Sequence, residues 1–304
     1  MPEPGTLTPR IHHLTLRPGT PVMARSPGVL QVGLDEPAVR VDDEPDVRRV
    51  LAALARPGGV PAGEELPDAA TALLHRLERA RLLVEVPDAE VRPDPALVTL
   101  RAQFGPDAVR RQAGRDAAMI AVRADPATAA HLTPLLDRAG LHHVTRPVGH
   151  HAGDPGDLTT AAHLIVTTGP LDRSLLDPLI RSSVPHLLVT GAATGRRVGP
   201  FVHPGLTACL RCVDAHEALH DARRPLLLSQ AARAAADQPP PVDPLLDQIA
   251  LAWAVRDLLR YLEGDEPSTW SATVDIGPVA APERVRWGRH LDCGCAWDTI
   301  TQFP

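Results

Sequence analysis

The spacing of hydrophobic residues over positions 1–92 predicts a small domain of strands and helices. Leu30, Val32 and Leu34 alternate with other positions, which is typical of a strand with one buried face. Farther along, apolar residues recur at helical spacing over 47–54 and 67–81. We therefore expect two helices in these segments. The expected strands are 13–17, 21–25, 29–34, 38–42 and 82–86.

From residue 117 onward, short apolar runs alternate with helical patterns, and this predicts a parallel, doubly wound sheet. The clearest helix is 243–262, which follows the cap residue Asp243 and stops before Gly264. The proline-containing segment 221–242 before it is expected to include a mobile crossing loop. The other expected strands are 117–122, 141–147, 163–168, 186–190, 269–276 and 283–288, and the other expected helices are 108–113, 125–139 and 174–182.

Together these patterns predict an α/β chain of two domains, residues 1–92 and 93–304. A chain of 304 residues is long enough for two separate cores. We interpret helix 243–262 as a core helix, with a homodimer interface as the alternative. Its expected buried side comprises Leu245, Leu246, Ile249, Trp253, Leu258 and Leu262.

Charge and hydropathy exclude several classes of partner. The net charge of −6 includes no basic block, so neither nucleic acid nor an anionic membrane is expected as a main partner. The chain has no apolar run long enough for a transmembrane helix, and MPEPGTLTPR lacks the pattern of a signal peptide. We therefore expect a cytoplasmic protein.

The sequence also argues against nucleotide binding. It contains no lysine and no asparagine, so no lysine is present to hold a phosphate. The turn after the first strand of the second domain, residues 122–128, contains no glycine and places Asp125 where phosphate would lie. The second strand ends in Arg146-Pro147 rather than in an acidic residue for a ribose hydroxyl. No nucleotide cofactor is expected.

The chain has four cysteines, and they form two close pairs, Cys209-x-x-Cys212 and Cys293-Gly-Cys295. A Cys-x-x-Cys knuckle places two sulfurs on one side of a turn, and Gly294 gives the shorter pair backbone freedom. Four thiolates complete a tetrahedral Zn²⁺ shell and leave no position for a reactant. We therefore predict a structural zinc site that ties the C-terminal region to the middle of the second domain.

Two other interpretations of the cysteines stay open: unrelated buried thiols, or a redox dithiol at Cys209 and Cys212. A redox pair usually opens a helix directly after a strand in a thioredoxin-like unit, and the pattern here does not predict that unit. Nearby histidines are interpreted as turn or surface residues, because four cysteines suffice. These are His203, His216, His220 and His290.

The second domain resembles a known family in its zinc motifs. A strand–helix sheet followed by VGPFVHPGLTACLRCVDAH, and later by Trp287 and His-Leu-Asp-Cys-Gly-Cys, is similar to the ThiF/MoeB-like, ubiquitin-activating fold. More narrowly, it resembles the partner subunits of YcaO cyclodehydratases, over roughly residues 14–297. The resemblance implies a degenerate, Rossmann-like adenylation domain that has lost its nucleotide chemistry. Family members often have two Cys-x-x-Cys pairs, whereas the second pair here is Cys-x-Cys.

The first domain resembles the PqqD-like, winged-helix recognition element of ribosomally made peptide biosynthesis. In that family a leader peptide adds to the third strand of the sheet and packs against the last helix. The resemblance implies an edge at 38–42 and a helix at 67–81. A winged helix used only for packing or dimerisation is the alternative. The implied peptide-binding residues are Val39, Arg40, Val41, Leu73, Arg76 and Leu77.

These resemblances imply a non-catalytic partner that binds a precursor's leader peptide. It would present the precursor to a YcaO-type, ATP-dependent cyclodehydratase, which makes azoline, thiazole or oxazole rings. One alternative is an ATP-dependent adenylating enzyme of the ThiF/MoeB type, acting on a peptide or carrier-protein carboxylate. Another is a zinc scaffold whose winged-helix unit binds a protein rather than a leader peptide.

Overall fold

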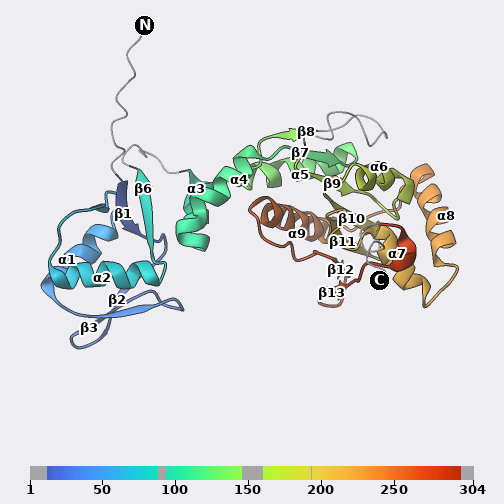
Figure 1. The fold of residues 1–304 in the computed structure, drawn as a ribbon. Helices are drawn as coiled ribbons and strands as arrows, with labels where there is room; N and C mark the ends of the chain where they lie inside the picture. Colours follow the sequence, from blue (N-terminus) through green and yellow to red (C-terminus); the bar gives the residue numbers. More distant parts are fainter. Residues whose placement is uncertain (1–11, 88–93, 146–159, 193, 296–304) are drawn as a thin grey trace, which may run out of the picture. The chain divides into compact units, whose positions relative to one another are not determined.

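A computed structural model describes residues 12–87, 94–145, 160–192 and 194–295 (Figure 1). The chain forms two compact units, residues 1–112 and 113–304. This boundary lies beyond the expected one at 92/93, because helix α3 (Pro95–Phe104) packs with the first unit. Arg17 donates from Nε to the carbonyl of Ala102 and from Nη2 to that of Gln103, each at 2.8 Å. The sequence pattern missed α3 because its apolar residues do not gather on one side.

The first unit contains two small antiparallel sheets. Each has three strands, in the orders β5-β1-β6 and β2-β3-β4. All five strands expected here are confirmed to within about two residues. The bounds are β1 (His12–Leu16), β2 (Val22–Ser26), β3 (Val29–Val32), β4 (Val39–Asp42), β5 (Val60–Pro61) and β6 (Leu83–Pro87).

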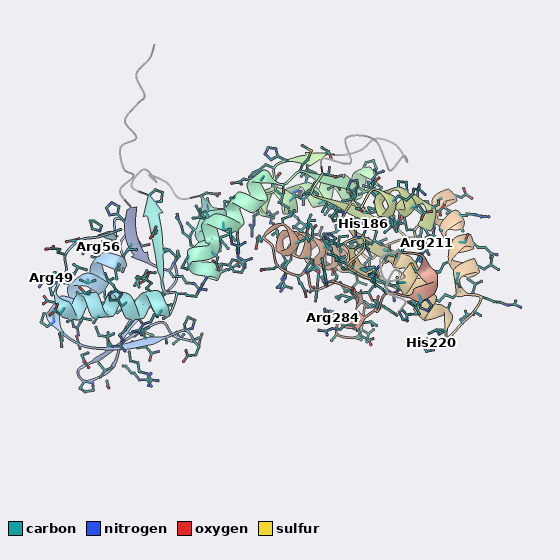
Figure 2. The ribbon with its side chains drawn as sticks, viewed as in Figure 1. Arg49, Arg56, His186, Arg211, His220 and Arg284 are labelled. Carbon is teal, nitrogen blue, oxygen red and sulfur yellow. The ribbon has the colours of Figure 1, made fainter. Side chains whose placement is uncertain are left out.

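Two amphipathic helices cover these sheets, α1 (Pro45–Leu54) and α2 (Asp68–Arg79), and both confirm the expected pattern. Leu51 and Leu54 of α1 share a core with Leu73 and Leu77 of α2. Arg49 lies on the exposed side of α1, as Figure 2 shows. The unit therefore has its own hydrophobic core.

The second unit is built on a seven-stranded sheet of order β13-β12-β11-β10-β9-β7-β8. One half of the sheet, β8, β7, β9 and β10, is parallel, as predicted. In the other half, each strand from β10 to β13 pairs antiparallel with the next one along the chain. The strand order β8-β7-β9-β10 is that of a Rossmann-like sheet. The bounds are β7 (Ile120–Arg123), β8 (Val144–Thr145), β9 (Ala162–Val166), β10 (His186–Ala192), β11 (Gly195–Val202), β12 (Ala272–Ile276) and β13 (Glu283–Arg286).

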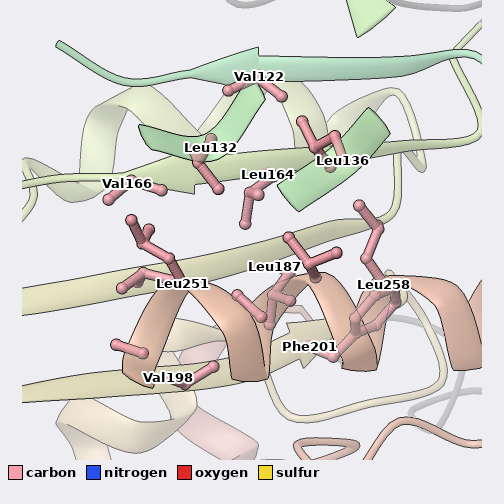
Figure 3. Close-up of a cluster of buried hydrophobic side chains, with 14 of the residues drawn as sticks. Val122, Leu132, Leu136, Leu164, Val166, Leu187, Val198, Phe201, Leu251 and Leu258 are labelled. Atoms are coloured by element: carbon pink, nitrogen blue, oxygen red, sulfur yellow. The ribbon is translucent and has the colours of Figure 1, made fainter. Parts of the chain in front are cut away.

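Helices cover both faces of the parallel half, so its strands are apolar on both sides. On one face, α5 (Pro126–Arg138) and α9 (Pro244–Leu262) pack over the sheet, and Figure 3 shows Leu132, Leu164 and Leu251 meeting there. On the other face, Ile165 and Leu188 pack with α6 (Asp177–Arg181) and α7 (Leu210–Ala218). Two further α-helices of the described residues are α4 (Ala108–Ala117) and α8 (Arg224–Asp237).

Two expectations for the second unit were wrong. Residues 221–242 contain helix α8, which was not predicted because prolines in this segment suggested a loop. Pro225 instead lies in the first turn of α8, a position that proline tolerates. The buried face of α9 is also rotated from the expected one: Leu245 and Ile249 are 75% and 47% exposed. Ala250 and Ala254 are buried instead, because small side chains let the helix lie close to the sheet.

Among the described residues, no helix combines the length and apolar character needed to cross a bilayer. Arg146, which was expected at the end of the second strand in place of an acidic residue, lies outside the described residues.

Candidate functional site

The four cysteines, distant in sequence, converge in the second unit. Cys209 caps the N-terminus of α7 and Cys212 lies in its first turn, whereas Cys293 and Cys295 follow the last strand. The Sγ atom of Cys209 lies 3.8 Å from that of Cys212 and 3.2 Å from that of Cys293. The Sγ atoms of Cys212 and Cys295 are 3.3 Å apart. All four lie within 4.8 Å of one another, so the cluster could hold a metal ion.

These distances fit a tetrahedral thiolate site. Metal–sulfur bonds of about 2.3 Å imply sulfur–sulfur separations of about 3.8 Å. A disulfide would need about 2.05 Å, and all four cysteines are free thiols. The Cys209–Cys212 pair opens helix α7, but it does not directly follow a strand, because β11 ends at Val202. Its sulfurs face a second pair of thiols rather than solvent, as a closed metal site requires.

Hydrogen bonds from one backbone N–H and one guanidinium support the cluster from a second layer. The backbone N–H of His290 donates to Sγ of Cys212 at 3.3 Å, and Nη2 of Arg289 donates to the carbonyl of Cys295 at 3.1 Å. Hydrogen bonds from the thiols of Cys209, Cys293 and Cys295, with the one from His290, lower the pKa of Cys212. A lowered pKa favours the thiolate at Cys212, whereas the hydrogen bond with Cys212 raises the pKa of its neighbour Cys209.

Histidines border the cluster without joining it. Within the described residues, the metal-ligand group consists of cysteines alone. A ring nitrogen of His216 (Nε2) lies 3.0 Å from the carbonyl of Gly288, and Nδ1 of His203 lies 3.2 Å from the Tyr261 hydroxyl. These contacts hold the loops around the cysteines in place.

A second candidate site lies in the first unit, at the free edge of β4. Among the described residues, only β3 pairs with β4 in this sheet. The Asp43 N–H donates to the carbonyl of Gly28 at 2.9 Å, and antiparallel ladders alternate between bonded and non-bonded pairs. In this register Val39 and Val41 bond to β3, and the backbone N–H and C=O of Arg40 point to the open edge. A guanidinium N–H of Arg76, on α2, donates to that Arg40 carbonyl.

A groove of about 950 Å³ runs along this edge. Arg25, Arg40, Arg76 and Arg79 line it together with two acidic residues, Asp35 and Glu36. Within the described part of the chain, none of these four arginines forms an ion pair with a carboxylate. Arg25 donates to the side-chain oxygen of Gln31, and Nε of Arg79 donates to the carbonyl of His75 at 3.3 Å.

The residues implied for peptide binding divide into two groups. Arg40 and Arg76 are exposed in the groove. The apolar members Val39, Val41, Leu73 and Leu77 are buried together in the core, at 7%, 5%, 2% and 0% exposure. Sequence reasoning missed Arg25 and Arg79. Arg79 lies one turn after Arg76 on α2, a spacing that could have indicated it.

A third place of interest is the crevice outside the carboxyl ends of β9 and β10, where doubly wound sheets bind ligands. Arg196 lies there, 2% exposed, with its Nε 3.0 Å from Asp247. Its Nη1 donates to the carbonyls of Thr167 and Gly191 at 2.8 and 2.7 Å. Burial lowers the pKa of Arg196, and the carboxylates of Asp247 and Asp125 oppose this shift.

The helix that follows β7 has its first N–H groups already occupied. Asp125 is the N-cap of α5, and its Oδ1 accepts from the N–H groups of Ala127 and Thr128 at 3.0 and 3.1 Å. Burial raises the pKa of Asp125, but hydrogen bonds from the side chain and backbone of Thr128 and from Ala127 outweigh it and lower the pKa overall. A carboxylate therefore fills the place of a phosphate at this helix N-terminus.

Several solved structures share the fold of this chain. A heterocyclase in complex with substrate and cofactor aligns at a TM-score of 0.68 and 16% identity, over 95% of this chain and 40% of that one. The heterocyclase TruD aligns at 0.69 and 17%, over 95% and 43%. MccB from E. coli, solved with MccA, aligns at 0.61 and 12%, over 93% and 99%. No family model matches the chain. No curated protein matches it either.

These likenesses confirm the resemblance found in the sequence at the level of the fold, which the chain shares with heterocyclases and MccB. The chain spans less than half the length of the two heterocyclases.

Proposed function

We propose that this chain is a non-catalytic partner in azoline-forming peptide biosynthesis. It binds the leader segment of a ribosomally made precursor and presents the precursor to a YcaO-type, ATP-dependent cyclodehydratase. The observation that carries the proposal is the open edge of β4 beside α2, in a chain with the fold of heterocyclases and MccB. An extended peptide that adds to such an edge gains main-chain hydrogen bonds.

In this proposal the first unit is a winged-helix, PqqD-like recognition domain. The order of three strands (β2 to β4), helix α1, the two-residue strand β5, helix α2 and the closing strand β6 supports it. The backbone N–H and C=O of Arg40 would bond to the added strand. The buried residues Val39, Val41, Leu73 and Leu77 would shape the edge from within rather than contact the peptide.

The second unit, in this proposal, is a degenerate ThiF/MoeB-like scaffold stapled by structural Zn²⁺. Cys209, Cys212, Cys293 and Cys295 would be the four ligands, which leaves no open coordination position. Free thiols in this number also favour a reducing, cytoplasmic location.

The state of the sheet's ligand crevice supports a role without ATP. The Arg196 guanidinium occupies the ends of β9 and β10, and the Asp125 carboxylate occupies the N–H groups of α5. A phosphate at the N-terminus of α5 would have to compete with the Asp125 carboxylate for these N–H groups. The ATP-dependent adenylating enzyme remains the alternative, and pyrophosphate exchange with a candidate peptide would detect it.

The test is isothermal titration of the full-length, zinc-loaded chain against the precursor peptide encoded beside its gene. Arg40→Pro removes the outward N–H of β4 and leaves the bonds of Val39 and Val41 to β3 in place. Ala24→Pro is the matched control, because the register places Ala24 at the outward position of the opposite edge strand, β2. We expect Arg40→Pro to abolish binding and Ala24→Pro to retain it. Equal loss in both variants, or no binding by the wild type, would refute the proposal.

A further inference from the structure

The groove beside β4 is locally positive in a chain whose net charge is −6. Its four arginines outnumber its two carboxylates, and none of the four is held in an ion pair within the described residues. Two other exposed arginines of the same unit do form ion pairs: Arg48 pairs with Asp43, and Arg81 with Asp107 at 2.5 Å. The groove arginines are therefore available to a ligand.

The arginines lie on both sides of the position that an added strand would take. Side chains of a strand alternate between the two faces of a sheet. Val39 and Val41 point to the face covered by α2, on which Arg76 and Arg79 are exposed. Arg40 points to the opposite face, where it lies across from Gln31, the partner of Arg25. Adjacent residues of a bound peptide would thus meet Arg76 and Arg79 in one direction and Arg40 in the other.

Arg76 would change its hydrogen-bond partner when a peptide strand binds. Its guanidinium now donates to the outward carbonyl of Arg40. A backbone N–H of an added strand would take over this carbonyl, because that is the bond which extends the ladder. The guanidinium would then be free for a carboxylate, which arginine binds through charge-assisted, bidentate hydrogen bonds.

We infer that the segment bound at the β4 edge is acidic, with Asp or Glu at two adjacent positions of the added strand. One carboxylate binds Arg76 and Arg79, and the next binds Arg40. This inference rests on the proposed function and specifies the class of its peptide. A nucleic acid would offer phosphates to the arginines but no peptide backbone to extend the sheet, so the peptide is the occupant that uses both features.

The experiment selects ligands without knowledge of the precursor. A phage library of random linear peptides is panned on the full-length, zinc-loaded chain, and selected peptides are synthesised with each Asp or Glu changed to Asn or Gln. Binding is measured by fluorescence anisotropy to wild type, Arg40→Gln, Arg76→Gln and Arg79→Gln. Arg56→Gln is the control: Arg56 is an exposed arginine beside α1 that does not line the groove (Figure 2).

We expect adjacent acidic residues in the selected peptides, and about tenfold weaker binding when Arg40 or Arg76, or the matching peptide carboxylate, is neutralised. Affinity should fall with added salt. Arg76→Glu should regain binding to peptides that carry Lys in place of the acidic residue, a compensation that a folding defect cannot produce. Arg56→Gln should bind as wild type does.

Other results would overturn the inference in distinguishable ways. Some selected peptides could lose binding to Arg40→Pro but not to Ala24→Pro, and yet tolerate neutralisation of their carboxylates. That result would leave the proposed function standing and refute the acidic class. Peptides that bind independently of the β4 edge, or no peptides at all, would refute both. A single-stranded oligonucleotide that binds as tightly through the same arginines would refute a peptide as the occupant.

Discussion

The Sγ atoms of Cys209 and Cys293 lie 3.2 Å apart, although 84 positions separate the two residues in sequence. The first begins α7, and the second follows the β12–β13 hairpin at the edge of the seven-stranded sheet. A metal held here would therefore close a loop that contains α7, α8, α9 and two strands. Ligand binding and the stability of the second unit should be coupled.

The first prediction follows from this coupling. Cys209→Ser and Cys295→Ser should each lose the bound Zn²⁺ and lower the Tm of the second unit by roughly 5–10 °C. Metal content by mass spectrometry and calorimetry of the purified variants are the measurements. His220→Gln, at an exposed residue just beyond α7 (Figure 2), is the control and should change neither. Wild-type zinc content and Tm in both cysteine variants would rule out a four-thiolate site.

The second prediction concerns a buried carboxylate on α9. Asp257 is fully buried and accepts from the N–H groups of Ser268 and Thr269 at 3.0 and 2.8 Å, and from both hydroxyls. Asp257→Ala leaves these donors without an acceptor, so the unfolding free energy should fall by about 3 kcal/mol. Asp257→Asn should cost less, because one oxygen remains. Urea unfolding measures both, and the exposed Asp237→Ala on α8 should match wild type.

The third prediction concerns Arg196. Arg196→Met removes the buried cation and leaves Asp247 unpaired, so it should destabilise the second unit by about 3 kcal/mol. The double variant Arg196→Met with Asp247→Leu should recover part of this loss, because the unpaired carboxylate of Asp247 is then removed as well. Thermal unfolding of the four proteins forms a double-mutant cycle. Additive losses in the cycle would show that the two residues do not interact.

The fourth prediction is a pH dependence of stability. His186 is fully buried at the start of β10, and burial lowers its pKa from 6.5 to about 4, although the bond to the Val184 carbonyl opposes this. Between these values the unfolded chain binds a proton that the folded chain does not. The unfolding free energy should therefore be unaffected by His186 protonation above pH 6.5. It should decrease as pH falls from 6.5 toward 4, by up to about 3 kcal/mol.

Urea unfolding at a series of pH values measures this slope. His186→Asn keeps an N–H donor for the Val184 carbonyl but cannot take up a proton, so its stability should fall less steeply between pH 6.5 and pH 5. The exposed His220→Asn should retain the wild-type slope. Identical slopes for wild type and His186→Asn would mean that another group governs this range.

Local pattern was enough to predict most elements of this fold. The strands of both units other than β5, and helices α1, α2, α5 and α9, follow from period-two and period-3.6 spacing, which depends only on neighbouring residues. Helix α8 was missed because prolines at a helix start resemble those of a loop. The buried face of α9 was misassigned because alanines carry little weight in a hydrophobic pattern, yet they pack closest to the sheet.

The sequence by itself determined the clustering of cysteines into two pairs, the absence of a glycine-rich phosphate loop, and the alternation that builds a Rossmann-like sheet. Only the tertiary structure decided that the cysteine pairs meet, that Arg196 bonds to the carbonyls at the ends of β9 and β10, and that Arg25, Arg40, Arg76 and Arg79 line one groove. The reason is physical. Secondary structure follows from interactions within a few residues, whereas these sites depend on strand order and register, which are set by packing between distant segments.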